Sequence, residues 1–220
     1  MYTEHELILK EAASRYGVCL VRENTMGNSG NKVFEVKTAQ DAYILKASIY
    51  SAQKEKHLAF ELNWMFYLAE HLTGIVRPQK SINGNLFEII NIGEKTYLLS
   101  LFEKAPGKIV DPNNPDEFNE TLFYHLGALM GEMHRLTIDY KGNIRTPAFE
   151  WTGAVNGWRY TNILQDEAVR LCQQKYYDAI NTLPIDKESY GIIHWDIHTD
   201  NFFVDNGNIK IFDFEACQFN

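Results

Sequence analysis

The spacing of apolar residues in the first half of the chain predicts a helix, several strands and a second, longer helix. Apolar positions repeat at helical spacing over residues 3–16, and Gly17 ends that segment. Short apolar runs bounded by turn residues predict strands over 18–23, 32–38, 42–48, 76–82, 86–91 and 95–101. A helix over 54–72 is predicted from a single apolar stripe, which consists of Leu58, Leu62, Met65, Ala69 and Leu72.

The second half of the chain is predicted to be mostly helical and to end in a small ribbon. One helix is expected to begin at Asn114-Pro115, because proline fits the first turn of a helix, and another is expected over 160–182. Short strands are predicted over 191–194, 202–204 and 209–212, with a tight turn at 206–208. The breaker Pro106-Gly107 predicts a domain boundary near residue 104, and hence domains over 1–104 and 105–220.

Composition and net charge indicate which kinds of protein and partner fit this chain. The 220 residues are 45% hydrophobic and 23% charged, which suffices for a folded core. A net charge of −8 without a Lys/Arg run argues against nucleic acid as a partner and mildly favours a cationic small molecule. The sequence shows no signal peptide and no long apolar run, so we expect no membrane contact and a cytoplasmic protein. Three scattered cysteines indicate reduced thiols.

The candidate chemistry lies in the stretch His194-Trp195-Asp196-Ile197-His198-Thr199-Asp200-Asn201 and in the later Asp213-Phe214-Glu215. The predicted hairpin brings Asp196, Asn201 and Asp213 towards one end of the ribbon. Oxygen atoms of Asn201 and Asp213 suit Mg²⁺, which takes few protein ligands and leaves room for phosphate oxygens. Asp196 is then free to orient a hydroxyl and accept its proton. This set of groups predicts phosphoryl transfer.

The spacing His-x-Asp-x-x-x-x-Asn with a following Asp-Phe resembles the catalytic signature of protein kinases. Trp195 in place of arginine, the second histidine His198 and Glu215 in place of glycine make the chain similar to the aminoglycoside phosphotransferase and choline kinase-like family. The resemblance implies an α+β, protein-kinase-like two-lobe fold, with an antiparallel-sheet N-lobe and a mostly helical, here incomplete, C-lobe. A hairpin whose polar loop residues only cap turns is the alternative.

Two features of the first half fit the same resemblance. The loop Met26-Gly27-Asn28-Ser29-Gly30-Asn31 lies between two strands and lacks the Walker A spacing, so a plain hairpin turn remains an alternative. The resemblance makes it a cover over nucleotide phosphates, with Met26, Ser29 and the following Val33 at the nucleotide. Lys46 lies in an apolar strand and needs a partner or a ligand there. The resemblance makes it the lysine that binds the α- and β-phosphates.

The remaining nucleotide-site residues follow from the resemblance alone. Both Glu55 and Glu61 fall at the edges of the apolar stripe of helix 54–72, and the resemblance selects Glu61 as the ion-pair partner of Lys46. It also places a hinge that reads adenine at 100–107, including Ser100 and Phe102. An apolar floor under adenine is assigned to Phe203 and Ile211.

The histidines of the motif are expected to be structural. His194 is predicted to be a core residue that supports the loop, and His198 is predicted to act similarly, with contact to phosphate or substrate as the alternative. A zinc site built from His194, His198 and Asp196 is rejected, because an extended loop points the three side chains in different directions.

The predicted activity is transfer of the γ-phosphate of ATP, or of GTP, with Mg²⁺ to a hydroxyl of a small molecule. Aminoglycoside-, choline- and homoserine-like acceptors all remain open. A protein Ser/Thr kinase and a truncated, non-catalytic nucleotide-binding module are the alternatives. Family members usually continue with further helices beyond the position of Asn220, so the chain is a fragment or a short member. We therefore expect exposed apolar surface and a tendency to form homo-oligomers.

Overall fold

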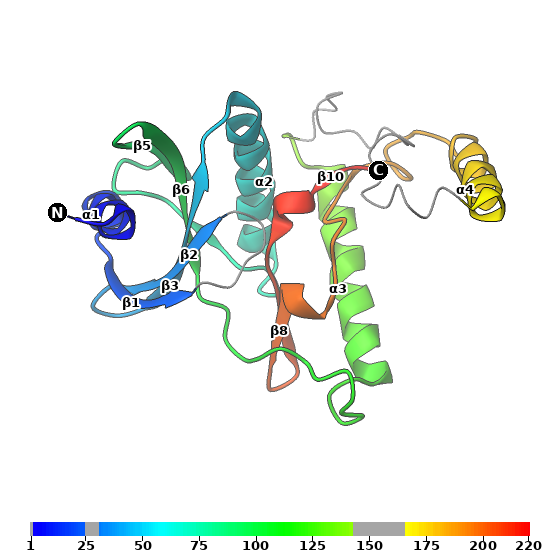
Figure 1. Cartoon of the computed structure of the whole chain (residues 1–220). Helices are drawn as coiled ribbons and strands as arrows, with labels where there is room; N and C mark the ends of the chain where they lie inside the picture. Colours follow the sequence, from blue (N-terminus) through cyan, green and yellow to red (C-terminus); the bar gives the residue numbers. More distant parts are fainter. Residues whose placement is uncertain (1, 25–30, 143–165) are drawn as a thin grey trace.

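A computed structural model of the chain describes residues 2–24, 31–142 and 166–220. In the described part, an antiparallel sheet with a helix on each face precedes a second half that contains helices and two small two-stranded sheets (Figure 1). This arrangement confirms the predicted α+β fold. No helix in the described ranges is both long enough and apolar enough to cross a membrane.

The sheet contains six strands, all paired antiparallel, in the order β1-β2-β3-β6-β4, with β5 also paired to β6. The strands are β1 (Cys19–Asn24), β2 (Lys32–Lys37), β3 (Ala42–Ile49), β4 (Pro78–Gln79), β5 (Phe87–Ile92) and β6 (Lys95–Glu103). Because β6 has a neighbouring strand on both sides, most of its backbone N–H and C=O groups are hydrogen-bonded within the sheet.

Helix α1 (Glu4–Tyr16) covers one face of the sheet. Thr3 caps its first turn through a reciprocal pair with Glu6, and Gly17 ends it in the left-handed conformation that glycine adopts without strain. A buried cluster joins the helix to the sheet and includes Ile8, Ala12, Phe34 and Leu45, none of which is exposed.

Helix α2 (Ala52–His71) packs on the opposite face and connects the sheet to the second half of the chain (Figure 1). The Trp64 ring is fully buried and meets the Phe214 ring edge-on at 5.4 Å between centroids. Its Nε1–H donates to the buried Thr137 hydroxyl at 2.9 Å. The central core is therefore shared between the two halves of the chain.

The strand predicted over 76–82 is wrong in extent, since β4 contains only Pro78 and Gln79. The residues before it pair elsewhere: the amide of Val76 donates to Ile211 O at 3.0 Å, and the amide of Ile211 donates to Gly74 O at 2.8 Å. The residues after it form a turn, in which the Ser81 amide donates to Asn85 O. Periodicity alone does not show such a change of partner.

The helix predicted to begin at Asn114-Pro115 begins later, as α3 (Glu120–Ile138). Upstream side chains form turns instead: Asp111 accepts from the Asn113 amide and Asn114 accepts from the Asp116 amide. Such local hydrogen bonds compete with helix formation. Asn119 is the true N-cap and accepts from the Leu122 amide at 3.1 Å.

The C-terminal elements hold the predicted motif. They are α4 (Glu167–Ile180), β7 (Ile192–Ile193), the 3₁₀ turn η4 (Thr199–Asn201), β8 (Phe202–Asp205), β9 (Asn208–Ile211), the 3₁₀ turn η5 (Phe214–Ala216) and β10 (Gln218–Phe219). Asn206 and Gly207 adopt positive φ between β8 and β9, so the predicted hairpin turn is confirmed. The start of the helix predicted over 160–182 lies outside the described residues.

Candidate active site

His194 supports the loop between β7 and η4. Its side chain is 2% exposed, and its ring lies 4.4 Å from the Phe214 ring between centroids. Since Phe212 O only accepts, Nε2 of His194 donates to it at 3.1 Å, while Nδ1 accepts from the Asp196 amide at 3.3 Å. Burial lowers the pKa of His194, which keeps the ring neutral. The prediction of a structural core histidine is confirmed.

Asp196 and Asn201 face each other across the loop. The Nδ2 group of Asn201 donates to Asp196 O at 2.8 Å and to Asp196 Oδ2 at 3.2 Å. Asn201 is 7% exposed, whereas the Asp196 side chain is 55% exposed. Asp196 is therefore fixed through Asn201 and still accessible to a second molecule.

Asp213 lies two residues after the end of β9 and is held beside this loop. The Phe212 amide donates to Asn201 O at 3.0 Å, which ties the residue before Asp213 to the loop. Asp213 itself adopts a left-handed conformation with φ 63° and ψ 62°, and Trp195 has φ 70°. Non-glycine residues in this region carry strain, which proteins retain where a functional side chain must be aimed.

Lys46 of β3 contacts Asp213, with 2.6 Å between Nζ and Oδ1. The predicted ion pair with Glu61 is not formed, because the Glu61 carboxylate is not within ion-pairing distance of Lys46 Nζ. Burial tends to lower the pKa of Lys46, but the carboxylates of Asp213 and Glu61 outweigh it and the pKa is raised. Lys46 thus stays charged and is held at the predicted metal ligand.

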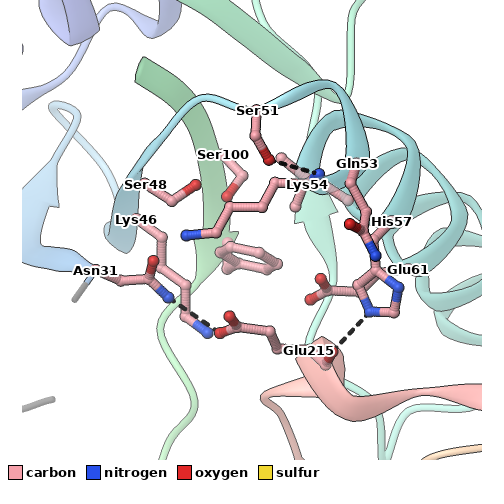
Figure 2. A pocket seen from close by; sticks show the side chains of 12 residues that line it. Asn31, Lys46, Ser48, Ser51, Gln53, Lys54, His57, Glu61, Ser100 and Glu215 are labelled. Atoms are coloured by element: carbon pink, nitrogen blue, oxygen red, sulfur yellow. Dashed lines mark hydrogen bonds between the residues drawn. The ribbon is translucent and has the colours of Figure 1, made fainter. Parts of the chain in front are cut away.

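Glu61 of α2 is 4% exposed and directs its carboxyl group into a cavity between α2 and the sheet (Figure 2). The described residues offer it no hydrogen bond, and its attraction to Lys46 is long-range. Burial raises the pKa of Glu61 to about 8, a shift that Lys46 opposes and that Asp213 and Glu215 increase. Glu61 lies near Lys46, as predicted, but it does not form the predicted ion pair with Lys46.

Glu215 links three elements, a role that sequence reasoning missed. Its Oε2 accepts from Asn31 Nδ2 at 3.0 Å, just before β2 begins, and its backbone O accepts from His57 Nε2 of α2 at 2.7 Å (Figure 2). Asp213, two residues upstream, is thereby tied to both halves of the chain. The sequence feature that could have indicated this role is Glu215 itself, which occupies the position of glycine in protein kinases.

Strand register places three predicted nucleotide residues on one face of the sheet. Val33 pairs opposite Lys46, which pairs opposite Ser100, and opposed residues share a face. Phe102 lies on this face too, and its ring centroid is 5.7 Å from Lys46 Nζ.

The hinge prediction needs correction for Ser100 and Phe102. Each has paired strand neighbours on both sides, Ser100 with Lys46 and Phe87 and Phe102 with Ile44 and Pro78. Their backbone groups are therefore used within the sheet, and only their side chains face the site. Backbone contact with adenine stays a prediction, and we expect it from residues after Glu103, where β6 ends.

The predicted apolar floor also needs correction. Ile211 pairs with Phe202, is fully buried and faces the core. Phe203 is on the other face of the hairpin, where its ring meets that of Phe212 at 4.8 Å between centroids. Because neighbouring residues of a strand point to opposite faces, Phe212 and not Ile211 lies on the face of Phe203. The role of that face as a floor under adenine stays a prediction. Met26 and Ser29 lie outside the described residues.

The donor set fits a hard divalent cation. Asp213 supplies a carboxylate, and Asn201 is buried with its Oδ1 free of hydrogen bonds within the described ranges. Oxygen ligands in small number, next to a partly exposed carboxylate, suit Mg²⁺, which keeps open positions for phosphate. No group of three His, Cys, Asp or Glu residues in those ranges gathers to hold a metal alone.

Comparison with known proteins agrees with this geometry. The model of a family described as "Phosphotransferase enzyme family" matches residues 21–220. The amicoumacin kinase of Bacillus subtilis (strain 168) is 33% identical over 221 residues, covering 98% of this chain and 64% of that protein. The homoserine kinase of Neisseria meningitidis serogroup B is 25% identical over 195 residues, covering 86% of this chain and 59% of that protein. The chain thus spans less than two thirds of these relatives.

A solved structure shows the same fold. The amicoumacin kinase hAmiN, in complex with AMP-PNP, Ca²⁺ and Ami, superposes with a TM-score of 0.75 at 26% identity. The match covers 100% of this chain and 66% of that one.

Proposed function

The chain belongs to the phosphotransferase enzyme family, and we propose that it carries the nucleotide and catalytic half of an ATP-dependent kinase acting on a small-molecule hydroxyl. The observation that carries this proposal is the convergence of Asp196, Asn201, Asp213 and Lys46, from three separate stretches of sequence, at one site. Similarity to amicoumacin kinase supports it, as does the solved relative that holds AMP-PNP and Ca²⁺.

In the proposed reaction, Asp196 orients the acceptor hydroxyl and receives its proton while the hydroxyl oxygen attacks the γ-phosphorus. The bond between the γ-phosphorus and the oxygen that bridges it to the β-phosphorus breaks, and ADP leaves with that oxygen. Its exposed carboxylate is accessible, and Asn201 fixes its direction. Asn201 Oδ1 and Asp213 would hold Mg²⁺, which when bound would spread the negative charge of the phosphate oxygens. Lys46 would bind phosphate oxygens from the β3 side.

Nucleotide binding must change the partner of Lys46. In the structure, the ammonium group of Lys46 contacts Asp213 at 2.6 Å. A cation at Asp213 would compete with Lys46 for the Asp213 carboxylate. The ammonium group of Lys46 would then be released to contact the phosphate and Glu61. The family arrangement of lysine with the α2 glutamate is proposed for this ligand-bound state.

We propose an amine-bearing acceptor. Homoserine, the substrate named for one relative, carries both an amino group and a hydroxyl. Near Asp196, the side chain of Asp200 is 70% exposed, and the whole chain has a net charge of −8. Carboxylates at the entrance attract cations and raise their local concentration.

We also propose that the division near residue 104 separates a nucleotide-binding lobe, 1–104, from a partial catalytic lobe, 105–220. Strand β6 ends at Glu103, which supports this placement. The expected homo-oligomer and cytoplasmic location stay predictions.

The proposed activity is tested by ³¹P NMR of ATP and Mg²⁺ with a panel of amino alcohols, homoserine and aminoglycosides. We expect a new phosphate-ester signal with at least one acceptor, and we expect Asp196→Asn to lower its rate by at least about 100-fold. The matched control Asp205→Asn alters an aspartate of the β8–β9 hairpin outside the proposed site. An equal rate in Asp196→Asn and wild type would refute the role of Asp196.

A further inference from the structure

A cavity of about 390 Å³ lies on the α2 side of Lys46, between the sheet, the start of α2 and η5 (Figure 2). Lys46, Glu61, Ser100 and Phe102 also belong to the predicted nucleotide site. The remaining part of the wall has no role in the proposed reaction. That part includes Ser48, Ser51, Gln53 and Lys54.

The sheet side of this cavity presents hydroxyl groups. Ser48 lies two residues after Lys46 on β3 and therefore shares its face, and Ser100 pairs opposite Lys46 on β6. Ser100 is 3% exposed, lines the cavity, and its hydroxyl makes no hydrogen bond within the described part of the chain. Because Ser100 lines the cavity, its hydroxyl is left for a ligand or water to bind.

The helix side presents positive charge. The cavity is lined by Ser51, the N-cap of the 20-residue helix α2, whose first amides carry partial positive charge. Lys54 extends from the first turn across the cavity towards Ser48 and Ser100 (Figure 2). The Ser51 hydroxyl oxygen accepts from the Lys54 amide at 3.2 Å, which leaves its hydrogen free to be donated.

The acidic groups around the cavity do not oppose an anion at this end. Burial raises the pKa of Glu61 to about 8, which reduces the negative charge of its carboxyl group near neutral pH. Glu215 lies at the Lys46 end, where its Oε2 is bound by Asn31. Glu55, in the first turn of α2, accepts from the Tyr50 hydroxyl at 2.9 Å and does not line the cavity.

We propose that this cavity is a binding subsite for a phosphate group, held by Lys54, Ser48, Ser100 and the first turn of α2. A helix N-terminus with a lysine and hydroxyl donors matches the needs of a phosphate oxygen anion. The phosphate belongs either to the nucleotide, in which case the inference rests on the proposed function, or to a separate phosphorylated molecule. The hydroxyl of Ser100, which makes no hydrogen bond within the described residues, gains a partner in either case.

Calorimetric titration of the whole chain with tripolyphosphate, and separately with inorganic phosphate, tests the subsite without a nucleotide. We expect Lys54→Ala to weaken binding by about tenfold, which is the loss of one charge-assisted contact. Ser48→Ala provides a second variant that leaves the charge unchanged. Lys56→Ala is the matched control, because Lys56 is exposed on the same helix and does not line the cavity.

The source of the phosphate follows from competition. Displacement of tripolyphosphate by Mg²⁺–ATP, with weaker ATP binding in Lys54→Ala, supports the subsite and assigns it to the nucleotide. Inorganic phosphate that binds beside saturating Mg²⁺–ATP, and is lost in Lys54→Ala, supports it as a separate site. Equal affinities in wild type, Lys54→Ala and Ser48→Ala, or no binding by wild type, would overturn the proposal.

Failure of the proposed kinase function can be distinguished from failure of the phosphate subsite. A wild-type chain that transfers no phosphate to any acceptor but binds tripolyphosphate through Lys54 leaves the subsite standing. A chain that transfers phosphate and binds all ligands equally in Lys54→Ala leaves only the proposed function standing.

Discussion

Replacing Glu61 with glutamine should remove a pH dependence of folding that its buried position creates. The folded state holds the pKa of Glu61 at about 8, against an ordinary value of 4.5. Between these values the folded state binds more protons than the unfolded state, so the free energy of unfolding falls as pH rises. The contribution of the protonated carboxyl is therefore fully present below about pH 4.5 and lost by about pH 8.

The size of the effect follows from the shift. At about 1.36 kcal/mol per pKa unit, the change from 4.5 to about 8 corresponds to an upper limit of about 5 kcal/mol. Movement of Lys46 towards an ionised Glu61 would reduce this value. We expect Glu61→Gln to gain at least about 1.5 kcal/mol relative to wild type between pH 5.5 and pH 8.

Urea unfolding of both proteins at several pH values in that range measures the difference directly, because other titrating groups cancel between them. Glu70→Gln is the control, since Glu70 is an exposed residue of the same helix whose contact with Arg77 spans 3.6 Å. Parallel stability profiles for wild type and Glu61→Gln would refute the reasoning that burial keeps Glu61 protonated.

Three further substitutions test the packing and the nucleotide floor. Thr137→Val removes the acceptor of the buried Trp64 N–H and should cost about 1–3 kcal/mol in urea unfolding, whereas the exposed Thr121→Val should cost little. Gly107→Ala should destabilise by more than about 1 kcal/mol, because φ is 89° and the added carbon would lie 2.3 Å from Val204 O; an unchanged unfolding midpoint would contradict this. Phe212→Ala should weaken ATP binding by about tenfold in calorimetry, and equal binding would remove Phe212 from the adenine floor.

The sequence predicts those elements whose signals are local. Thr3 and Gly17 delimit α1 through their own backbone and side-chain chemistry, and the turn at Asn206-Gly207 needs only two residues with positive φ. The grouping of Asp196, Asn201 and Asp213 follows from a hairpin of fixed length. Each of these predictions depends on residues close together in the chain.

Two of the errors arise where segments distant in sequence decide the structure. Residues 74–76 pair with Ile211 and not with the sheet, which shortens β4. Both Glu61 and Asp213 lie near Lys46, and only the three-dimensional structure places Asp213 at 2.6 Å from its ammonium group. The predicted helix start at Asn114-Pro115 is wrong for a local reason. The side chains of Asp111 and Asn114 form turns, and these outweigh the favourable position of Pro115.

The distinction between Ile211 and Phe212 shows how sensitive a strand prediction is to one residue. Both are apolar and both lie beside Asp213, so composition favours neither. Pairing of Ile211 with Phe202 turns it into the core and leaves Phe212 beside Phe203. A shift of one position reverses the face that a side chain occupies.

The central claim is that Asn201, Asp213 and Lys46 form one metal–nucleotide site. The most direct test is the melting temperature of the chain with Mg²⁺ alone, with ATP alone and with both, in wild type and in Asp213→Ala. A ligand that binds only the folded state raises the melting temperature. We predict a rise with ATP that requires Mg²⁺ and disappears in Asp213→Ala. No rise in wild type, or an equal rise in the variant, would contradict the account.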